Sequence, residues 1–153
     1  MIGLIQRVNS ASVVIDGETT AGIGAGLLVL VGVQRGDGPR EAARLAERIL
    51  QYRVFADARQ RMNLDVRSVA GSVLLVPQFT LAADTRKGNR PGFSRAAPPE
   101  LGQRLFQTLV QECRDRYERV ATGRFGADMQ VSLTNDGPVT FWLEVTPTDD
   151  FSA

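Results

Sequence analysis

Strand-like segments lie at both ends of this 153-residue chain, and only two helical patterns lie between them. Residues 1–16 have a β-branched bias, and several of the other, shorter strand segments are continuous apolar runs typical of buried strands. They are residues 1–16, 19–23, 27–31, 72–76, 129–133 and 139–145. Because strands outnumber helices and occupy both ends, the pattern predicts an α+β fold: a curved, partly barrel-like sheet with two packed α-helices.

Both helical patterns begin at proline, which suits the first position of a helix. The first begins at Pro39 and the second at 98–100, and in each the apolar residues recur at helical spacing, which gives one buried face. These residues are Ala42, Leu45, Ala46, Ile49 and Leu50, then Leu101, Leu105, Leu109, Cys113 and Tyr117. We expect one domain over residues 1–153, with a loose tail after about residue 146.

The composition excludes several classes of function. The chain has no histidine, so Ser-His-Asp catalysis, Cys-His catalysis and histidine-ligated metal sites are excluded. Cys113 is the only cysteine, which excludes an internal disulfide and a cysteine zinc cluster. Its place in a helical pattern predicts a small buried hydrophobe rather than a nucleophile. We therefore expect no metal and no cofactor.

The charge balance limits the partners. Eighteen basic and seventeen acidic side chains leave a net charge of +1, which excludes a protein that coats nucleic acid by charge alone but not one that holds one end of it. No apolar run approaches the roughly 18 residues of a membrane span, and the first residues lack a targeting pattern. We expect a cytoplasmic protein that does not contact a membrane.

Residues 76–81 follow a predicted buried strand directly and bring polar groups to the point where the chain leaves the sheet. Gln78 supplies an amide and Thr80 a hydroxyl. A strand end holds its next backbone N–H groups rigidly, and such groups can stabilise an oxyanion without histidine. The alternative is a threonine that satisfies its own backbone in a turn.

Residues 135–140 (NDGPVT) lie between the last two predicted strands, where Asn-Asp-Gly favours a hairpin. Pro138 is unusual at the start of a strand because it removes a ladder donor. An X-Pro bond is held cis at a cost of only about 0.5–1 kcal/mol. A cis Gly137-Pro138 would aim two carbonyl groups in one direction, where they could hold a ligand ammonium. A plain tight turn is the alternative.

The loop over residues 85–99 carries four cations, two glycines and three prolines. The cations, Arg86, Lys87, Arg90 and Arg95, suit phosphates beside a strand-end pocket, and a solvated charged loop is the alternative. The acid nearest this loop, Asp84, is expected to pair with Arg86 or to cap the chain rather than to act on a substrate.

Four stretches resemble the D-aminoacyl-tRNA deacylase family: the first eighteen residues, 77–84 (PQFTLAAD), 88–100 and 122–145. The similarity runs from residue 1 to about residue 145, and the QFTL and NDGPVT motifs are far more specific together than alone. The resemblance implies a homodimeric hydrolase that cleaves the ester between a D-amino acid, or glycine, and the terminal adenosine of tRNA.

The resemblance also implies residue roles. It places the pocket at Gln78, Phe79 and Thr80, with Phe125 and Met129 close by. It makes Gly137-Pro138 a cis dipeptide that enters the neighbouring subunit's pocket. There its carbonyl groups would face the α-amino group of the substrate and exclude an L side chain.

One residue departs from the family pattern. The family's usual serine before Gln-Phe-Thr is Pro77 here, which has neither a hydroxyl nor a backbone N–H. A role given to that serine side chain therefore does not carry over. Proline also restricts Val76 to extended geometry, which suits a strand end.

Two chemical routes remain without histidine. Thr80 could attack or activate water, but it would need a base, and none is evident in the sequence. Alternatively, the N–H groups of Phe79 and Thr80 hold the oxyanion while a ribose hydroxyl or water attacks, and we favour this route. Two other functions stay open: a non-catalytic tRNA 3′-end binding protein of the same fold, and a general small-ester hydrolase.

Overall fold

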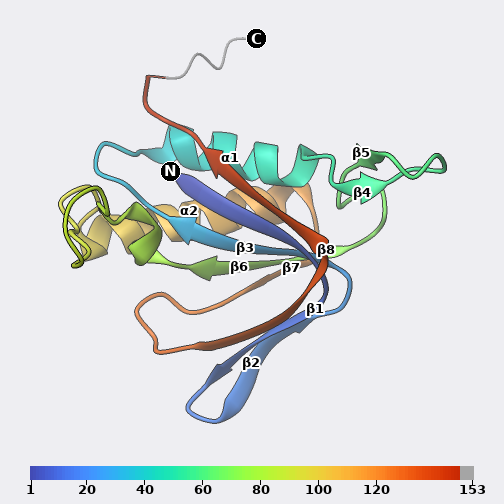
Figure 1. Ribbon diagram of the computed structural model, residues 1–153, viewed down its shortest axis with the longest axis horizontal. Coiled ribbons are helices and arrows are strands. Elements are labelled where there is room, and N and C mark those ends of the chain that lie inside the picture. Colours follow the sequence, from blue (N-terminus) through green and yellow to red (C-terminus); the bar gives the residue numbers. More distant parts are fainter. Residues whose placement is uncertain (149–153) are drawn as a thin grey trace.

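The computed structural model describes residues 1–148, in which a curved sheet carries two helices (Figure 1). Strand β1 (Ile2–Ile15) lies at its centre and is hydrogen-bonded to three other strands. Its first half pairs with β3 (Gly26–Gly32), its second half pairs with β2 (Glu18–Ile23), and β8 (Gln130–Glu144) follows nearly its whole length. All three pairings are antiparallel, so β1 fixes the position of half the sheet.

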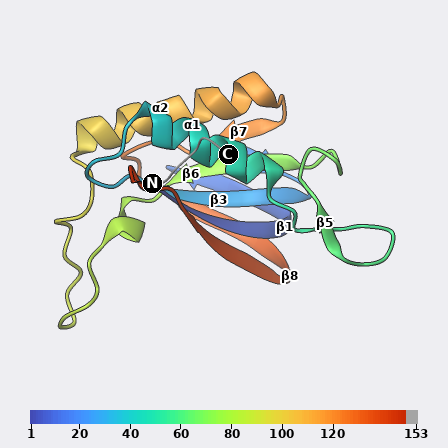
Figure 2. The same ribbon diagram turned by 90° about the horizontal axis from the view of Figure 1, so that it is seen from above.

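The other part of the sheet is parallel. Strand β3 pairs with β6 (Ser72–Pro77), and β6 pairs with β7 (Val120–Thr122). A parallel step needs a crossover connection, and α1 (Pro39–Gln51) and α2 (Pro99–Arg116) lie in the two crossovers. The two helices contact each other and cover one face of the sheet (Figure 2).

Three short elements lie outside this sheet. Strands β4 (Phe55–Ala56) and β5 (Met62–Leu64) form a separate hairpin after α1. The 3₁₀ turn η1 (Phe79–Ala82) follows β6 after one residue. The turn η1 therefore begins where the chain leaves the sheet, at the predicted site.

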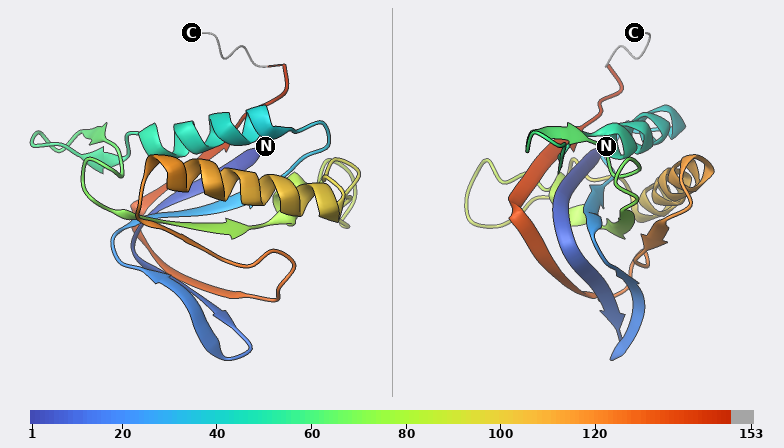
Figure 3. Two further views of the ribbon diagram at one scale, coloured as in Figure 1. Left: turned by 180° about the vertical axis from the view of Figure 1, so that it is seen from behind. Right: turned by 90° about the vertical axis from the view of Figure 1, so that its right-hand side faces the viewer.

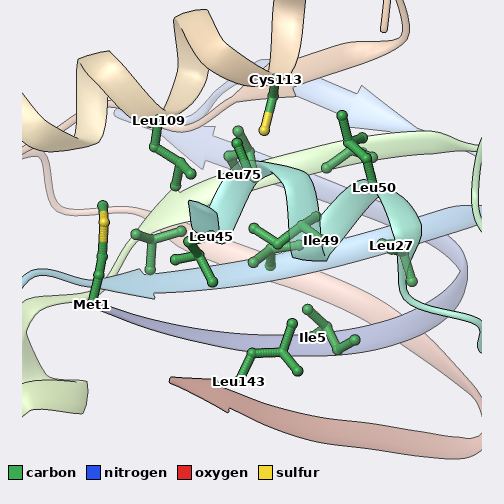
Figure 4. Packing of buried hydrophobic residues seen from close by; sticks show 14 of the residues in the cluster. Met1, Ile5, Leu27, Leu45, Ile49, Leu50, Leu75, Leu109, Cys113 and Leu143 are labelled. Carbon is green, nitrogen blue, oxygen red and sulfur yellow. The ribbon is translucent and has the colours of Figure 1, made fainter. Parts of the chain in front are cut away.

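The sheet is buried on both faces in its middle. Leu27 and Leu75 pack beneath the helices in the first core cluster (Figure 4), whereas Leu28 and Leu74 join Val13 of β1 in a second cluster. The curl of the sheet, seen end-on in the right panel of Figure 3, covers that second face. Burial on both faces explains why β3 and β6 read as continuous apolar runs.

A buried ion pair fastens the start of β1. The Met1 ammonium group donates to the Asp37 carboxylate at 2.9 Å and to the Val145 carbonyl at 2.6 Å. Burial raises the pKa of Asp37, although the ammonium group and the N–H of Gln34 stabilise the charged form. The contact joins β1, the loop before α1 and the residue after β8.

The predicted α+β class and both helices are confirmed, but the predicted hairpin at 134–138 is wrong. Segments 129–133 and 139–145 are parts of one strand, β8, and both parts pair with β1 in the same direction. The chain therefore does not reverse there. The signal misled because Asn, Asp, Gly and Pro mark bulges as well as turns.

The register shows an extended bulge in β8 instead. A single β1 residue, Arg7, lies opposite four β8 residues, 136–139. The flanking pairs are Gln6 with Thr140 and Val8 with Asn135. Pro138 is tolerated because a bulged residue needs no ladder N–H.

Two further points concern the last third of the chain. The sequence analysis missed β7, whose three residues are too few to show a period of two. The loose tail that we expected after about residue 146 falls mostly on 149–153, outside the described residues.

Gly26 packs directly against the backbone of β6. A Cβ atom built on Gly26 would lie 1.8 Å from the Ser72 carbonyl oxygen on β6, a backbone atom that cannot move without breaking the parallel pairing. We expect Gly26→Ala to lower the free energy of unfolding by about 3 kcal/mol or more in urea titration. Gly24→Ala is the control, because its Cβ would meet nothing within 4 Å. Equal stability of the two variants would contradict this close approach.

Candidate functional site

Hydrogen bonds to β3 hold the turn η1 in place. The Gln78 N–H donates to the Val31 carbonyl at 2.7 Å, and Leu81 and Ala83 close the turn by donating to Gln78 and Thr80 at 3.2 and 3.1 Å. The N–H groups of Phe79 and Thr80 precede the first of these turn bonds, so they have no partner within the turn. Two adjacent donors are therefore left at a rigid strand end.

Pro77 fits its position without losing a ladder bond. Since the Gln78 N–H points at β3, the nitrogen of the preceding residue points to the opposite side, toward β7. There β7 ends at Thr122, which pairs with Leu75. Proline at 77 therefore removes no hydrogen bond of the β6–β7 pairing.

One side of η1 opens on a largely apolar cavity of about 460 Å³. The structure brings four predicted site residues, Gln78, Phe79, Phe125 and Met129, to the walls of this cavity, together with Pro77. We call it the Phe125 cavity. The sequence analysis missed other walls, because single small or apolar residues carry no local signal. They include Ala97, Pro99, Gly102, Phe106 and Asp128.

Thr80 lines a different hollow, the Thr80 cleft, of about 350 Å³. Arg95, Trp142 and Glu144 also line this cleft. The Thr80 hydroxyl oxygen accepts a hydrogen bond from the Gln78 side-chain amide, and within residues 1–148 no acidic or basic side chain is hydrogen-bonded to it. An amide donor cannot take a proton, so this hydrogen bond does not activate the Thr80 hydroxyl as a nucleophile.

The Gly137–Pro138 peptide bond is cis, as the resemblance implied, and it lies in the β8 bulge. This bulge sits at the opposite end of the sheet from η1 (Figures 1 and 3). The structure therefore does not bring the dipeptide to the turn η1 within one chain.

Two side chains that the sequence analysis did not identify as supports hold the bulge. Arg7 donates to the Asp136 carbonyl at 3.2 Å and the Val54 carbonyl at 2.6 Å. The Asn135 amide donates to the Arg7 and Val139 carbonyls, both at 3.0 Å. Arg7 precedes the bulge by more than a hundred residues, so only the β1–β8 register reveals the contact.

The loop over residues 85–99, which we call the basic loop, is partly neutralised by Asp84. Arg86 forms two hydrogen bonds with the Asp84 carboxylate, at 2.9 and 2.7 Å, and these hold the pKa of Asp84 well below its usual range. This confirms the expected pair. Lys87 and Arg90 line a pocket together with that pair, whereas Arg95 lines the Thr80 cleft.

A reactive thiol, a cluster of metal-binding side chains and a membrane-spanning helix are all absent from residues 1–148. Cys113 is fully buried, and burial raises the pKa of its thiol to about 12, so it is not a thiolate nucleophile. Residues 1–148 contain no group of three or more acidic or cysteine side chains placed to bind a metal ion. Among these residues there is also no helix long and apolar enough to cross a membrane.

Comparison with known proteins assigns the family. The model of the family described as D-Tyr-tRNA(Tyr) deacylase matches residues 4–144. The chain belongs to this family. A D-aminoacyl-tRNA deacylase of Nitrosococcus oceani is 60% identical over 96% of this chain and 95% of its own length. One of Escherichia coli is 58% identical over 95% of this chain and 100% of its own.

Solved structures show the same fold as this deacylase-family chain. A protein named c-Myc DNA Unwinding Element Binding Protein superposes with a TM-score of 0.91 and 37% identity, covering 95% of this chain and 99% of its own. A probable eukaryotic D-amino acid tRNA deacylase gives a TM-score of 0.78 at 16% identity, covering 94% and 98%. At that identity, the second likeness concerns the fold alone.

Gly32, at the end of β3, packs directly against the turn η1 of this deacylase-family chain. A Cβ atom at Gly32 would lie 3.0 Å from the Leu81 Cβ, so Gly32→Ala should push η1 away from the sheet. We expect a loss of about 1–3 kcal/mol of stability and changed NMR shifts of the Phe79 and Thr80 amides. Gly22→Ala, whose Cβ would meet only one atom at 3.9 Å, should leave those shifts unchanged. Unchanged amide shifts in Gly32→Ala would show that this contact does not position the turn.

Proposed function

We propose that this protein hydrolyses the ester that joins a D-amino acid, or glycine, to the 3′-terminal adenosine of tRNA, and so recycles tRNA in the cytoplasm. Relatives named D-aminoacyl-tRNA deacylase, 58–60% identical over 95–96% of the chain, carry this proposal. The turn η1 supports it, because it places two unpaired N–H donors between two hollows at a rigid strand end.

The chemistry requires little from side chains because an aminoacyl ester is already activated. Water attacks the ester carbonyl carbon, and the N–H groups of Phe79 and Thr80 stabilise the oxyanion that forms. Collapse of this intermediate breaks the bond to the ribose oxygen, which leaves with a proton, while the amino acid leaves as a carboxylate. The neighbouring ribose hydroxyl orients the water, and the Thr80 hydroxyl, held by Gln78, positions the ester.

The two hollows bind different parts of the substrate. We assign the terminal adenosine to the Phe125 cavity, where the rings of Phe79 and Phe125 and the Met129 thioether offer apolar surface to a base. The aminoacyl group then lies toward Thr80. Pro77 lines the adenosine side, so the missing serine hydroxyl is not needed at the ester carbon.

Chiral selection is assigned to the Gly137–Pro138 bulge of a second copy. The bulge lies too far from its own turn to act there, and Arg7 and Asn135 brace it for a fixed contact. In the homodimer that we propose, its carbonyl oxygens face the α-amino group and leave no room for an L side chain. The half-exposed Trp142 beside the Thr80 cleft is the kind of apolar surface that a second subunit would cover.

A deacylation assay with D-Tyr-tRNA and L-Tyr-tRNA tests the function. We expect release of D-tyrosine at a rate that depends on enzyme concentration, and little release of L-tyrosine. Binding of tRNA without hydrolysis would favour the non-catalytic nucleic-acid binder, the class that the name of one structural neighbour suggests. Equal activity on a free D-tyrosine ester would favour a general small-ester hydrolase.

Thr80 variants separate a positioning role from a nucleophile. We expect Thr80→Ala to lower kcat by about tenfold or less, because only a hydrogen bond to the substrate is lost. Thr80→Trp should abolish activity by filling the cleft, and Thr80→Ser should resemble the wild type. Complete loss of activity in Thr80→Ala with tRNA binding intact would instead establish an attacking hydroxyl.

Gly137 variants test the chiral role. A Cβ atom at Gly137 would lie 2.7 Å from the Val139 Cγ2 and 2.9 Å from its nitrogen, at a φ of +134°, so Gly137→Ala must move the bulge. We expect the ratio of kcat/KM for D-Tyr-tRNA over L-Tyr-tRNA to fall by at least about tenfold. Gly17→Ala is the control, because it has a positive φ but no atom within 4 Å of the built Cβ. Full selectivity in a folded Gly137→Ala dimer would remove the bulge from the mechanism.

A further inference from the structure

Two exposed aromatic rings, Phe79 and Phe93, lie next to each other, and Phe79 lines the Phe125 cavity. Phe79 is 58% exposed and Phe93 is 41% exposed, although both are large apolar side chains. Their ring centroids are 5.2 Å apart with the planes tilted by 51°. Because Phe79 also lines the cavity, the pair extends the apolar surface of the cavity outward onto the basic loop.

The same loop presents cations that are not paired. Arg86 is held by Asp84, but the structure gives Lys87 and Arg90 no ion pair among the described residues. They line a pocket with Ser94, the residue after Phe93. Exposed rings beside unpaired cations are the combination that binds single-stranded nucleic acid, with bases stacked on the rings and phosphates on the cations.

The loop is also fixed at its base, although it projects from the body of the protein (Figure 2). Asp84 and Gly92 exchange two backbone hydrogen bonds of 2.7 and 3.1 Å. Arg35 donates its backbone N–H to the Arg95 carbonyl at 2.9 Å and its side chain to the Ser94 carbonyl at 2.7 Å. Phe93 is therefore held next to Phe79 before any ligand arrives, which lowers the entropy cost of binding.

We propose that Phe93, together with Phe79, is a stacking platform for the unpaired base that precedes the terminal adenosine of tRNA. This rests on the proposed function, which assigns that adenosine to the Phe125 cavity. The preceding nucleotide leaves the cavity past Phe79 and meets the Phe93 ring, while Lys87 and Arg90 take the adjoining phosphates. The platform reads no sequence, because every base has a face that stacks.

The experiment compares Phe93→Leu with Phe141→Leu. Phe141 is a matched control because it is 38% exposed and pairs with Tyr52 at 5.6 Å, on β8. Three substrates are used: D-Tyr-tRNA, D-Tyr-tRNA that lacks the base of the penultimate nucleotide, and D-tyrosyl-adenosine.

We expect Phe93→Leu to lower kcat/KM on D-Tyr-tRNA by about tenfold, mainly through KM, as loss of one stacked base implies. On the other two substrates, Phe93→Leu should match the wild type, because the base that it contacts is absent. Phe141→Leu should match the wild type on all three. An equal loss on all substrates, no loss on any, or dissociation of the dimer in Phe93→Leu would each overturn the platform.

A binding measurement keeps this result separate from the proposed function. A single-stranded RNA with 2-aminopurine at its penultimate position should lose fluorescence on binding the wild type, because stacking quenches the probe, and should keep it with Phe93→Leu. If the wild type hydrolyses none of the substrates, the proposed function fails. Quenching then still decides the platform, and equal quenching by both proteins would overturn it.

Discussion

The pairing of β1 with three other strands is the constraint on which the rest of the structure depends. Its halves are held by β3 and β2, while β8 runs beside both, so β8 has to absorb any mismatch in length. It does so at Arg7, where four residues of β8 bulge away from a single residue of β1. The sheet thus presents Gly137 and Pro138 from a braced position, which a flexible loop could not provide.

The parallel half of the sheet explains how a chain without histidine can support ester hydrolysis. The helices bury one face of β3 and β6, the curled sheet buries the other face, and the chain leaves β6 in a tight turn against β3. That turn offers fixed N–H donors, which need no proton transfer to act on an oxyanion. The Gln78 amide does not activate the Thr80 hydroxyl, and Cys113 is buried as a neutral thiol, so we assign the proposed chemistry to the backbone.

Much of the fold, and the position of the turn after β6, could be predicted from short-range sequence patterns. Apolar runs and proline starts gave β3, β6 and both helices, and the turn after β6 followed from polar residues directly behind a buried run. The rest depends on contacts distant in sequence. The segment at 134–138 carries strong hairpin residues, yet its conformation is decided by pairing with β1. The separation of Thr80 from Phe125 into two hollows has no sequence signal, because it depends on which side of η1 each residue faces.

A mixed dimer tests the central claim that two subunits build each site. One subunit carries Thr80→Trp, which blocks its turn, and the other carries Gly137→Ala, which displaces its bulge. The mixed dimer retains one site made from the intact turn of the second subunit and the intact bulge of the first. Equal mixing should therefore restore about a quarter of the wild-type D-selective deacylation. Mixed dimers that form but are no more active or selective than their parents would contradict the account.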